Sequence, residues 1–301
     1  MGRVLATVDI GSNTAHLLVA ETGDGSVRKL VDDSNWLSLG EIVGRERTIP
    51  PNMQEALIRT LNGYQKLASD QKAEGIYIFA TEAVRAASNS REVLKRIEQA
   101  CGLKVEIISG QREAEFGLRG VLLDSGFSSF ILAEVGGGSA QVAQCSRKRI
   151  KSEASLSLGT GTLIAKLGLS CPCDYAHLKR TQRLVEETLA TAEVLEEGGP
   201  LVACGGVARG LWRALHPDGN RILHVEELNF LIWSTQRLTS DQIVQRFQVK
   251  PKRARTLFPG AVVYKQIMER SGQEEMTISR FGVREGALLE MAEGKVSAWR
   301  V

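Results

Sequence analysis

Two short segments of the sequence combine an acidic residue with glycine and hydroxyl side chains. The first reads Asp9-Ile-Gly-Ser-Asn-Thr14 and the second reads Glu134-Val-Gly-Gly-Gly-Ser139. A turn of this composition brings backbone N–H groups close to an anion without obstruction by Cβ atoms, and its hydroxyls add donors. A carboxylate directly before the turn can hold a hydrated divalent cation, because hard cations prefer carboxylate oxygen. The pair of turns therefore predicts a site for a phosphate chain and its Mg²⁺.

The two segments also resemble each other. Residues 9–17 align with residues 134–142 as carboxylate, β-branched residue, glycine, two small residues, hydroxyl, alanine, polar residue and aliphatic residue. This agreement indicates an internal duplication with a boundary near residues 122–126. We expect a first lobe over residues 1–123 and a second lobe over residues 124–301, with a third glycine turn at Gly205 and Gly206.

Composition and charge exclude several classes of protein. The 38 lysines and arginines against 35 acidic residues give a net charge of +3, far less basic than is usual for a dedicated nucleic-acid binder. No apolar run approaches the roughly 20 residues of a membrane span, and no signal peptide is evident, so we expect a cytoplasmic protein with no membrane partner. The five scattered cysteines fit free thiols in a reducing compartment.

The arrangement of predicted elements indicates an α/β fold. Strand-like segments alternate with helices that we expect over residues 53–71, 90–101, 113–123 and 175–197, and a final strand over 276–279 leads to a closing helix over 285–293. Neither a Walker P-loop nor a dinucleotide-binding glycine motif is present, which disfavours a P-loop ATPase and a Rossmann dehydrogenase.

The sequence also offers a candidate for activating water. Glu113 and Glu115 follow Ser109 in the first turn of a predicted helix. Carboxylates there can simply complement the helix dipole, or one of them can take a proton from an attacking water. The residues alone do not decide between these two interpretations of the carboxylates.

Seven short motifs follow one another along the chain. They are Val8-Asp-Ile-Gly-Ser-Asn-Thr14, Ala80-Thr-Glu-Ala-Val-Arg85, Ile107-Ile-Ser-Gly-Gln-Arg-Glu-Ala114, Val135-Gly-Gly-Gly-Ser139, Ser157-Leu-Gly159, Gly205-Gly206 and Arg284-Glu-Gly286. In this order they resemble the motifs of the exopolyphosphatase/guanosine pentaphosphate phosphatase (Ppx/GppA) family. The resemblance implies two ribonuclease-H-like lobes of the actin, sugar kinase and Hsp70 superfold with an interdomain cleft, in a short form without extra C-terminal helical domains.

The resemblance further implies that the protein removes the terminal phosphate of inorganic polyphosphate or the 5′ γ-phosphate of pppGpp. Glu113 would be the catalytic base, aided by Glu134, while Asp9 and Glu134 would organise Mg²⁺. The helices of the second lobe could support a homodimer. The implied phosphate-binding residues are Gly11, Ser12, Asn13, Thr14, Arg85, Gly136, Gly137, Gly138, Ser139, Gln141, Gly205 and Gly206.

Two positions depart from the usual family pattern. Glu134 stands where the family usually has aspartate, and Gln141 stands where it usually has glutamate. The longer Glu134 can shift a metal or water by about a bond length, and Gln141 can neither accept a proton as a base nor bind Mg²⁺ as an anion. We therefore keep a second hypothesis, a catalytically weakened sensor that binds polyphosphate or a nucleotide. A small-molecule kinase of the same superfold is a third, less favoured hypothesis.

Overall fold

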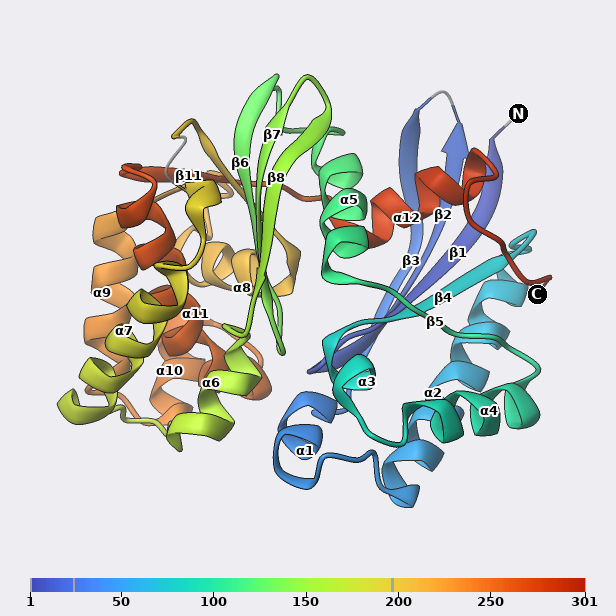
Figure 1. Cartoon of the computed structure of the whole chain (residues 1–301), viewed down its shortest axis with the longest axis horizontal. Coiled ribbons are helices and arrows are strands. Elements are labelled where there is room, and N and C mark those ends of the chain that lie inside the picture. Colours follow the sequence, from blue (N-terminus) through green and yellow to red (C-terminus); the bar gives the residue numbers. More distant parts are fainter. Residues whose placement is uncertain (1, 24, 196–197, 301) are drawn as a thin grey trace. The chain divides into compact units, whose positions relative to one another are not determined.

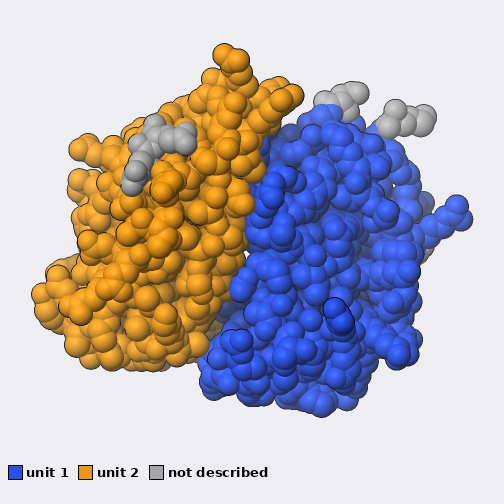
Figure 2. All heavy atoms as spheres, in the orientation of Figure 1, with its two compact units in different colours: residues 1–123, 282–301 blue, residues 124–281 orange. Residues whose placement is uncertain are grey.

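The computed structural model describes residues 2–23, 25–195 and 198–300. The chain divides into two compact units, one of residues 1–123 with 282–301 and one of residues 124–281 (Figure 2). The C-terminal segment 282–301 thus belongs to the first unit, not to the second lobe in which the sequence analysis places it. The physical reason is the closing helix α12 (Val283–Ala292), whose Leu288 is buried with Leu5 and Phe116 of the first unit.

The first unit is built on a five-stranded sheet of order β3-β2-β1-β4-β5. Strands β1 to β3 form an antiparallel meander, and β4 and β5 run parallel to β1. Side chains alternate along β1, so that Val8 faces one core with Leu57 and Leu5 faces another with Phe116. The elements are β1 (Arg3–Ile10), β2 (Thr14–Gly23), β3 (Ser26–Trp36), β4 (Ile76–Ala80), β5 (Glu106–Ile107), α1 (Leu39–Glu46), α2 (Pro51–Asp70), α3 (Glu82–Ala86), α4 (Ser90–Cys101) and α5 (Gly110–Val121), shown in Figure 1.

The second unit repeats this sheet. Its order is β10-β11-β9-β6-β7-β8, and β8-β7-β6-β9-β11 have the strand directions of β3-β2-β1-β4-β5. Only the edge strand β10, antiparallel to β11, is added. The expected α/β class with two ribonuclease-H-like lobes is thereby confirmed. The strands are β6 (Ser129–Val135), β7 (Ala140–Ser146), β8 (Arg149–Leu156), β9 (Leu201–Cys204), β10 (Ile222–His224) and β11 (Glu275–Ile278).

The helices of the second unit are gathered around α11 (Pro251–Arg270), whose Ala261, Tyr264 and Ile267 are fully buried. The helix expected over 175–197 ends at Leu189; a short 3-10 turn follows at Glu193–Leu195, and residues 196–197 lie outside the described residues. None of the helices in the described part of the chain is long and apolar enough to cross a membrane. The other helices are α6 (Thr160–Leu167), α7 (Tyr175–Leu189), α8 (Gly205–Leu215), α9 (Val225–Thr235) and α10 (Ser240–Phe247).

Helix α5 begins at Gly110, earlier than expected, because Ser109 caps it. The Ser109 Oγ accepts the backbone N–H of Arg112 at 3.1 Å. This helix crosses α12 at two glycines with backbone in direct contact. A Cβ on Gly286 would lie 1.8 Å from the carbonyl oxygen of Phe116, and one on Gly120 would lie 2.0 Å from that of Gly282. The crossing fixes the helix that carries Glu113.

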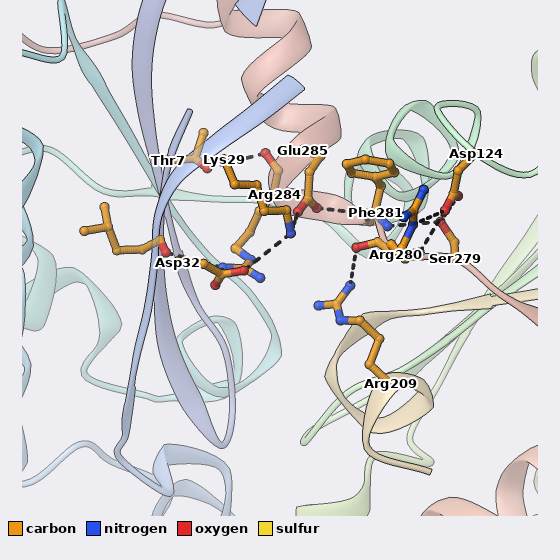
Figure 3. A network of polar contacts seen from close by, with 12 residues as sticks. Thr7, Lys29, Asp32, Asp124, Arg209, Ser279, Arg280, Phe281, Arg284 and Glu285 are labelled. Atoms are coloured by element: carbon orange, nitrogen blue, oxygen red, sulfur yellow. Dashed lines mark hydrogen bonds and ion pairs between the residues drawn. The ribbon is translucent and has the colours of Figure 1, made fainter. Parts of the chain in front are cut away.

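Asp124 organises the segments by which the chain enters and leaves the second unit. Its carboxylate accepts hydrogen bonds from Arg221 Nη1 and Ser279 Oγ, both at 2.6 Å, and from the backbone N–H of Arg280 at 3.1 Å. Figure 3 shows Ser279 and Arg280 directed at this carboxylate. The start of the unit at residue 124 and its end near residue 280 are therefore tied together.

Candidate functional site

The first predicted turn, residues 11–14, joins β1 to β2 as a tight hairpin. The backbone N–H of Gly11 donates to the carbonyl of Thr14 at 3.1 Å. The carbonyl of Ser12 accepts from Gly40 at 2.7 Å, and that of Asn13 accepts from residues 37 and 38 at 2.9 and 3.0 Å. Because N–H and C=O are antiparallel in a trans peptide, the N–H groups of Asn13 and Thr14 point away from residues 37–40. Such a turn presents donors to an anion.

The second predicted turn, residues 136–139, is built in the same way. The N–H of Gly136 donates to the carbonyl of Ser139 at 2.8 Å. The three glycine carbonyls of the turn accept hydrogen bonds from residues 159–162, at 2.8–3.3 Å between backbone atoms. By the same peptide geometry, the N–H groups of Gly137, Gly138 and Ser139 point away from residues 159–162. Successive N–H groups of this kind form an anion-binding concavity.

The segments that hold the two turns share a tetrapeptide. Leu37-Ser-Leu-Gly40 runs into the first two residues of α1, and Leu156-Ser-Leu-Gly159 ends directly before α6. Both glycines are required by space, since a Cβ on Gly40 would lie 2.7 Å from Ser12 Cβ and a Cβ on Gly159 would lie 2.2 Å from the carbonyl carbon of Gly138. The sequence analysis used the second copy only as a family motif and missed the first, although the identical letters were the available signal.

The duplication also extends to the strand register. Asp9 lies opposite His16 across β1 and β2, and Glu134 lies opposite Gln141 across β6 and β7. These are the pairs that the sequence alignment equates. Each acidic residue therefore occupies the same place relative to its turn.

Asp9 is the acidic residue of the first unit. It is partly exposed, but its Oδ1 is buried and has no hydrogen-bond partner among the described residues. Burial raises the pKa of Asp9 to about 6, and the charge of Arg284 acts in the opposite direction. Arg284 comes from the start of α12, is 6% exposed, and pairs with Asp32 at 2.7 Å (Figure 3). The sequence analysis used Arg284 only as part of a family motif, so its electrostatic link to Asp9 was missed.

Arg85 and Glu113 are both in the first unit. The Arg85 Nη1 donates to the carbonyl of Ile108 at 2.5 Å, and its Nη2 forms an ion pair with Glu82. Ile108 directly precedes the cap of α5, so Arg85 lies at the beginning of the helix that carries Glu113. The Glu113 side chain belongs to the first turn of that helix and is mostly buried, 9% exposed.

The second unit brings Glu134 together with Cys204 and Gly205. Glu134 is at the carboxyl end of β6, beside Cys204 of the parallel strand β9, and its Oε2 accepts from the Cys204 thiol at 3.4 Å. Gly205 has φ of +84°, and a Cβ there would lie 2.6 Å from Glu134 Oε1. A glycine is therefore needed at 205 for its backbone conformation and for the space that Glu134 occupies.

Gln141 contacts the second turn through its amide. The side chain is 2% exposed, and its Nε2 donates to Ser139 Oγ at 2.8 Å and to Ser155 Oγ at 3.3 Å. The amide thus joins the turn to β8. A carboxylate at this position could accept hydrogen bonds from the same hydroxyls but could not donate hydrogen bonds to them.

Gly206 is covered by an arginine that the sequence analysis did not single out by itself. Arg253 Nη1 donates to the Gly206 carbonyl at 2.9 Å. Burial, together with the charges of Arg209 and Arg213, lowers the pKa of Arg253 to about 10. The hydrogen bond joins residues 47 positions apart, so only the fold shows that Arg253 lies against Gly206.

Mg²⁺ is bound in proteins by one or two carboxylates, with water and substrate phosphate completing its shell. In the first unit, the buried Oδ1 of Asp9, which has no hydrogen-bond partner among the described residues, fits this donor set. In the second unit, the Glu134 carboxylate is a donor of the same chemistry. Within the described ranges there is no group of three or more His, Cys, Asp or Glu side chains arranged to hold a metal ion. Each carboxylate by itself suits a hydrated ion whose remaining ligands are water and substrate phosphate.

Comparison with solved structures agrees with this fold. A Ppx/GppA family member from Aquifex aeolicus superposes with a TM-score of 0.81 at 24% identity, covering 99% of this chain and all of that one. An exopolyphosphatase from Cytophaga hutchinsonii gives a TM-score of 0.88 at 20% identity, with 97% and 98% coverage.

Comparison of sequences identifies the family. Exopolyphosphatase 1 of Mycobacterium leprae is 27% identical over 97% of this chain and 90% of its own length. Exopolyphosphatase 2 of Mycobacterium tuberculosis is 26% identical over 96% of this chain and 98% of its own length. The sequence model of the Ppx/GppA phosphatase family matches residues 18–295. Since this match spans nearly the whole chain, the protein belongs to the Ppx/GppA phosphatase family.

Proposed function

We propose that this protein is a phosphohydrolase that releases the terminal phosphate of inorganic polyphosphate, with the 5′ γ-phosphate of pppGpp as a second candidate substrate. Membership of a phosphatase family supports the reaction class, and the names of its relatives support polyphosphate. The observation that carries the proposal is the pair of turns with the same construction, each preceded by a carboxylate and each presenting backbone N–H groups to an anion.

Each part of the site has a role in this reaction. The N–H groups of residues 13–14 and 137–139 bind phosphate oxygens, where charge develops as the anhydride bond breaks. Glu113 accepts a proton from the attacking water as general base, and its nearly complete burial shields that step from bulk solvent. Arg85 adds positive charge at the start of the same helix.

Asp9 and Glu134 would hold Mg²⁺ through carboxylate oxygens. When bound, the ion neutralises phosphate charge and polarises the phosphoryl oxygens. Arg253, beside Gly206, and Arg209 supply further positive charge for a polyanionic chain. The +3 net charge is therefore no obstacle to a highly charged substrate.

One observation favours a second function. Gln141, buried and bonded to Ser139, replaces a carboxylate next to the second turn. If that carboxylate is needed for turnover, the protein would bind polyphosphate or a nucleotide as a sensor and hydrolyse it slowly. Tight binding of these ligands without phosphate release would favour the sensor.

A phosphate-release panel tests the proposal. The purified protein is given polyphosphate of several lengths, pppGpp and ATP, each with Mg²⁺ or with EDTA. We expect phosphate release from polyphosphate with Mg²⁺ and none with EDTA. Glu113→Gln should reduce the rate by roughly 100- to 10,000-fold. Glu115→Gln, which changes a more exposed carboxylate paired with Arg112 on the same helix, is the matched control. A Glu113→Gln protein that keeps the parental rate would rule out Glu113 as the base.

A further inference from the structure

The carboxyl ends of β6 and β9 are joined by a tyrosine hydroxyl. The hydroxyl of Tyr264, from α11, accepts the backbone N–H of Val135 at 3.1 Å and lies 3.3 Å from the carbonyl oxygen of Cys204, to which it donates. Tyr264 is fully buried, and burial raises its pKa well above the usual value, so the hydroxyl keeps its proton. This bridge lies where the ladder between the two strands ends at the pair Glu134 and Cys204.

The same place fixes the carboxylate of Glu134 on two sides. The buried thiol of Cys204 donates to Oε2 at 3.4 Å, while Oε1 lies over Gly205, where any Cβ would be 2.6 Å away. A carboxylate with one oxygen hydrogen-bonded and the other bounded by a glycine has few rotamers left. Tyr264 in turn fixes the backbone on which the thiol is carried, because it binds the carbonyl of Cys204 itself.

We propose that Cys204 and Tyr264 are positioning residues that orient the Glu134 carboxylate for phosphate release, an inference that rests on the proposed function of that carboxylate. The thiol selects the rotamer of Glu134, and the tyrosine hydroxyl fixes the separation of β6 and β9 at that point. Neither side chain touches the substrate.

The thiol can be removed with little change of volume. Cys204→Ala should lower kcat for polyphosphate hydrolysis by about 10- to 100-fold with KM nearly unchanged, since a misplaced group of this kind affects the transition state. Cys204→Ser keeps an O–H donor and should restore most of the rate. The matched control is Cys145→Ala, which removes another fully buried thiol of the same sheet, one that donates to the Ala143 carbonyl at 3.7 Å. It should leave kcat unchanged.

The hydroxyl is tested by Tyr264→Phe, which retains the buried ring. We expect lower kcat, weaker Mg²⁺ binding by calorimetry and a lower Tm, because the Val135 N–H and the Cys204 carbonyl lose their partner. The control is Tyr77→Phe, which removes a hydroxyl that bonds to Glu106 at 3.0 Å in the first unit. That change should lower Tm without changing kcat.

A spectroscopic readout separates this inference from the proposed function. The Raman S–H stretch of Cys204, isolated as the difference between the parent and Cys204→Ala, should shift when Glu134→Gln replaces the carboxylate acceptor by an amide. If the parent releases no phosphate from any substrate, the proposed function fails, and this shift still shows whether the thiol holds Glu134. An unshifted band overturns the inference, as does a Cys204→Ala protein with parental kcat. Loss of activity in Cys204→Ala that serine does not restore would indicate packing alone, and also overturns it.

Discussion

The backbone N–H of Gly40 donates to the carbonyl oxygen of Ser12 at 2.7 Å, so the beginning of α1 holds the turn between β1 and β2. In the second unit the backbone N–H of Gly159 donates to the carbonyl oxygen of Gly138, the residue that aligns with Asn13, at 3.3 Å. In both units a glycine at the start of a helix lets two backbones approach closely enough to bond. The direction in which each turn presents its N–H groups is thus set by a segment that is not part of the turn.

A methyl group at either glycine should therefore misdirect the turn. In Gly159→Ala the new Cβ would lie 2.2 Å from the carbonyl carbon of Gly138, which is backbone and must move as a whole. We expect kcat/KM for polyphosphate to fall by about 100-fold, since a displacement of about 1 Å has this effect on a binding group. Steady-state phosphate release measures it. Gly44→Ala, in α1 with open space around its Cβ, is the control and should keep the parental value. A folded Gly159→Ala protein with unchanged kcat/KM would contradict the argument.

Much of the fold could be predicted from the sequence, as could the two turns, but not the segments that hold these turns. Residue type and spacing predict the two acidic turns, the α/β class and the duplication. The turns can be predicted because a hairpin turn is a local structure. The equivalence of Asp9 and Glu134 was correct for the same reason. The shared tetrapeptide at residues 37–40 and 156–159 was also in the sequence, but nothing local connects it to the turns that it holds.

Other features depend on contacts between distant segments. Arg253 lies 47 residues after Gly206, and Arg284 lies 252 residues after Asp32. Neither pair has a local signal, and the sequence analysis used Arg284 only as part of a family motif. The return of residues 282–301 to the first unit has the same origin, because Leu288 of α12 packs against Leu5 and Phe116, which come far earlier in the chain.

The crossing of α5 and α12 should tolerate no side chain at its centre. A Cβ on Gly286 would lie 1.8 Å from the carbonyl oxygen of Phe116, and this oxygen is backbone of α5, which cannot move away by a change of rotamer. We expect Gly286→Ala to lower the free energy of unfolding by about 3 kcal/mol, the upper end of the usual effect of overpacking a core. Urea denaturation measures this change. Gly63→Ala, at an open position in α2, should instead raise stability by up to about 1 kcal/mol. Equal stability of the two variants would mean that the crossing can open at little cost.

Stability at acid pH should depend on Asp32. Although burial raises its pKa, the charges and hydrogen bonds of Arg284 and Lys29 outweigh it and lower the pKa to about 2. The folded state thus binds the proton more weakly than the unfolded chain, in which the pKa is near 3.8. The stabilisation is therefore complete above about pH 4 and is lost as pH falls towards 2.

Denaturant titrations between pH 6 and pH 2.5 measure this dependence. The difference in free energy of unfolding between the parent and Asp32→Asn should be greatest above pH 4 and should shrink on acidification. Asp70→Asn, which changes an exposed carboxyl at the end of α2, serves as the control for a general loss of negative charge. A difference for Asp32→Asn that is constant across this range would show that the interaction with Arg284 does not depend on the charge of Asp32.

Gln141→Glu should raise the rate of phosphate release. The side chain is nearly inaccessible, but Ser139 and Ser155 hydroxyls surround its amide at 2.8 and 3.3 Å, and each can turn to donate to a carboxylate. The variant therefore places an acidic group beside the second turn with two hydroxyl donors for it, and we expect kcat to rise by about 10-fold or more, within the range of a positioned acid or base. Gln144→Glu, on the same strand and bonded to the Gly198 carbonyl, adds the same charge away from the turn and should not raise kcat. If Gln141→Glu binds polyphosphate as the parent does but turns over no faster, the amide at 141 is not what limits this protein, and the sensor hypothesis loses the observation that favours it.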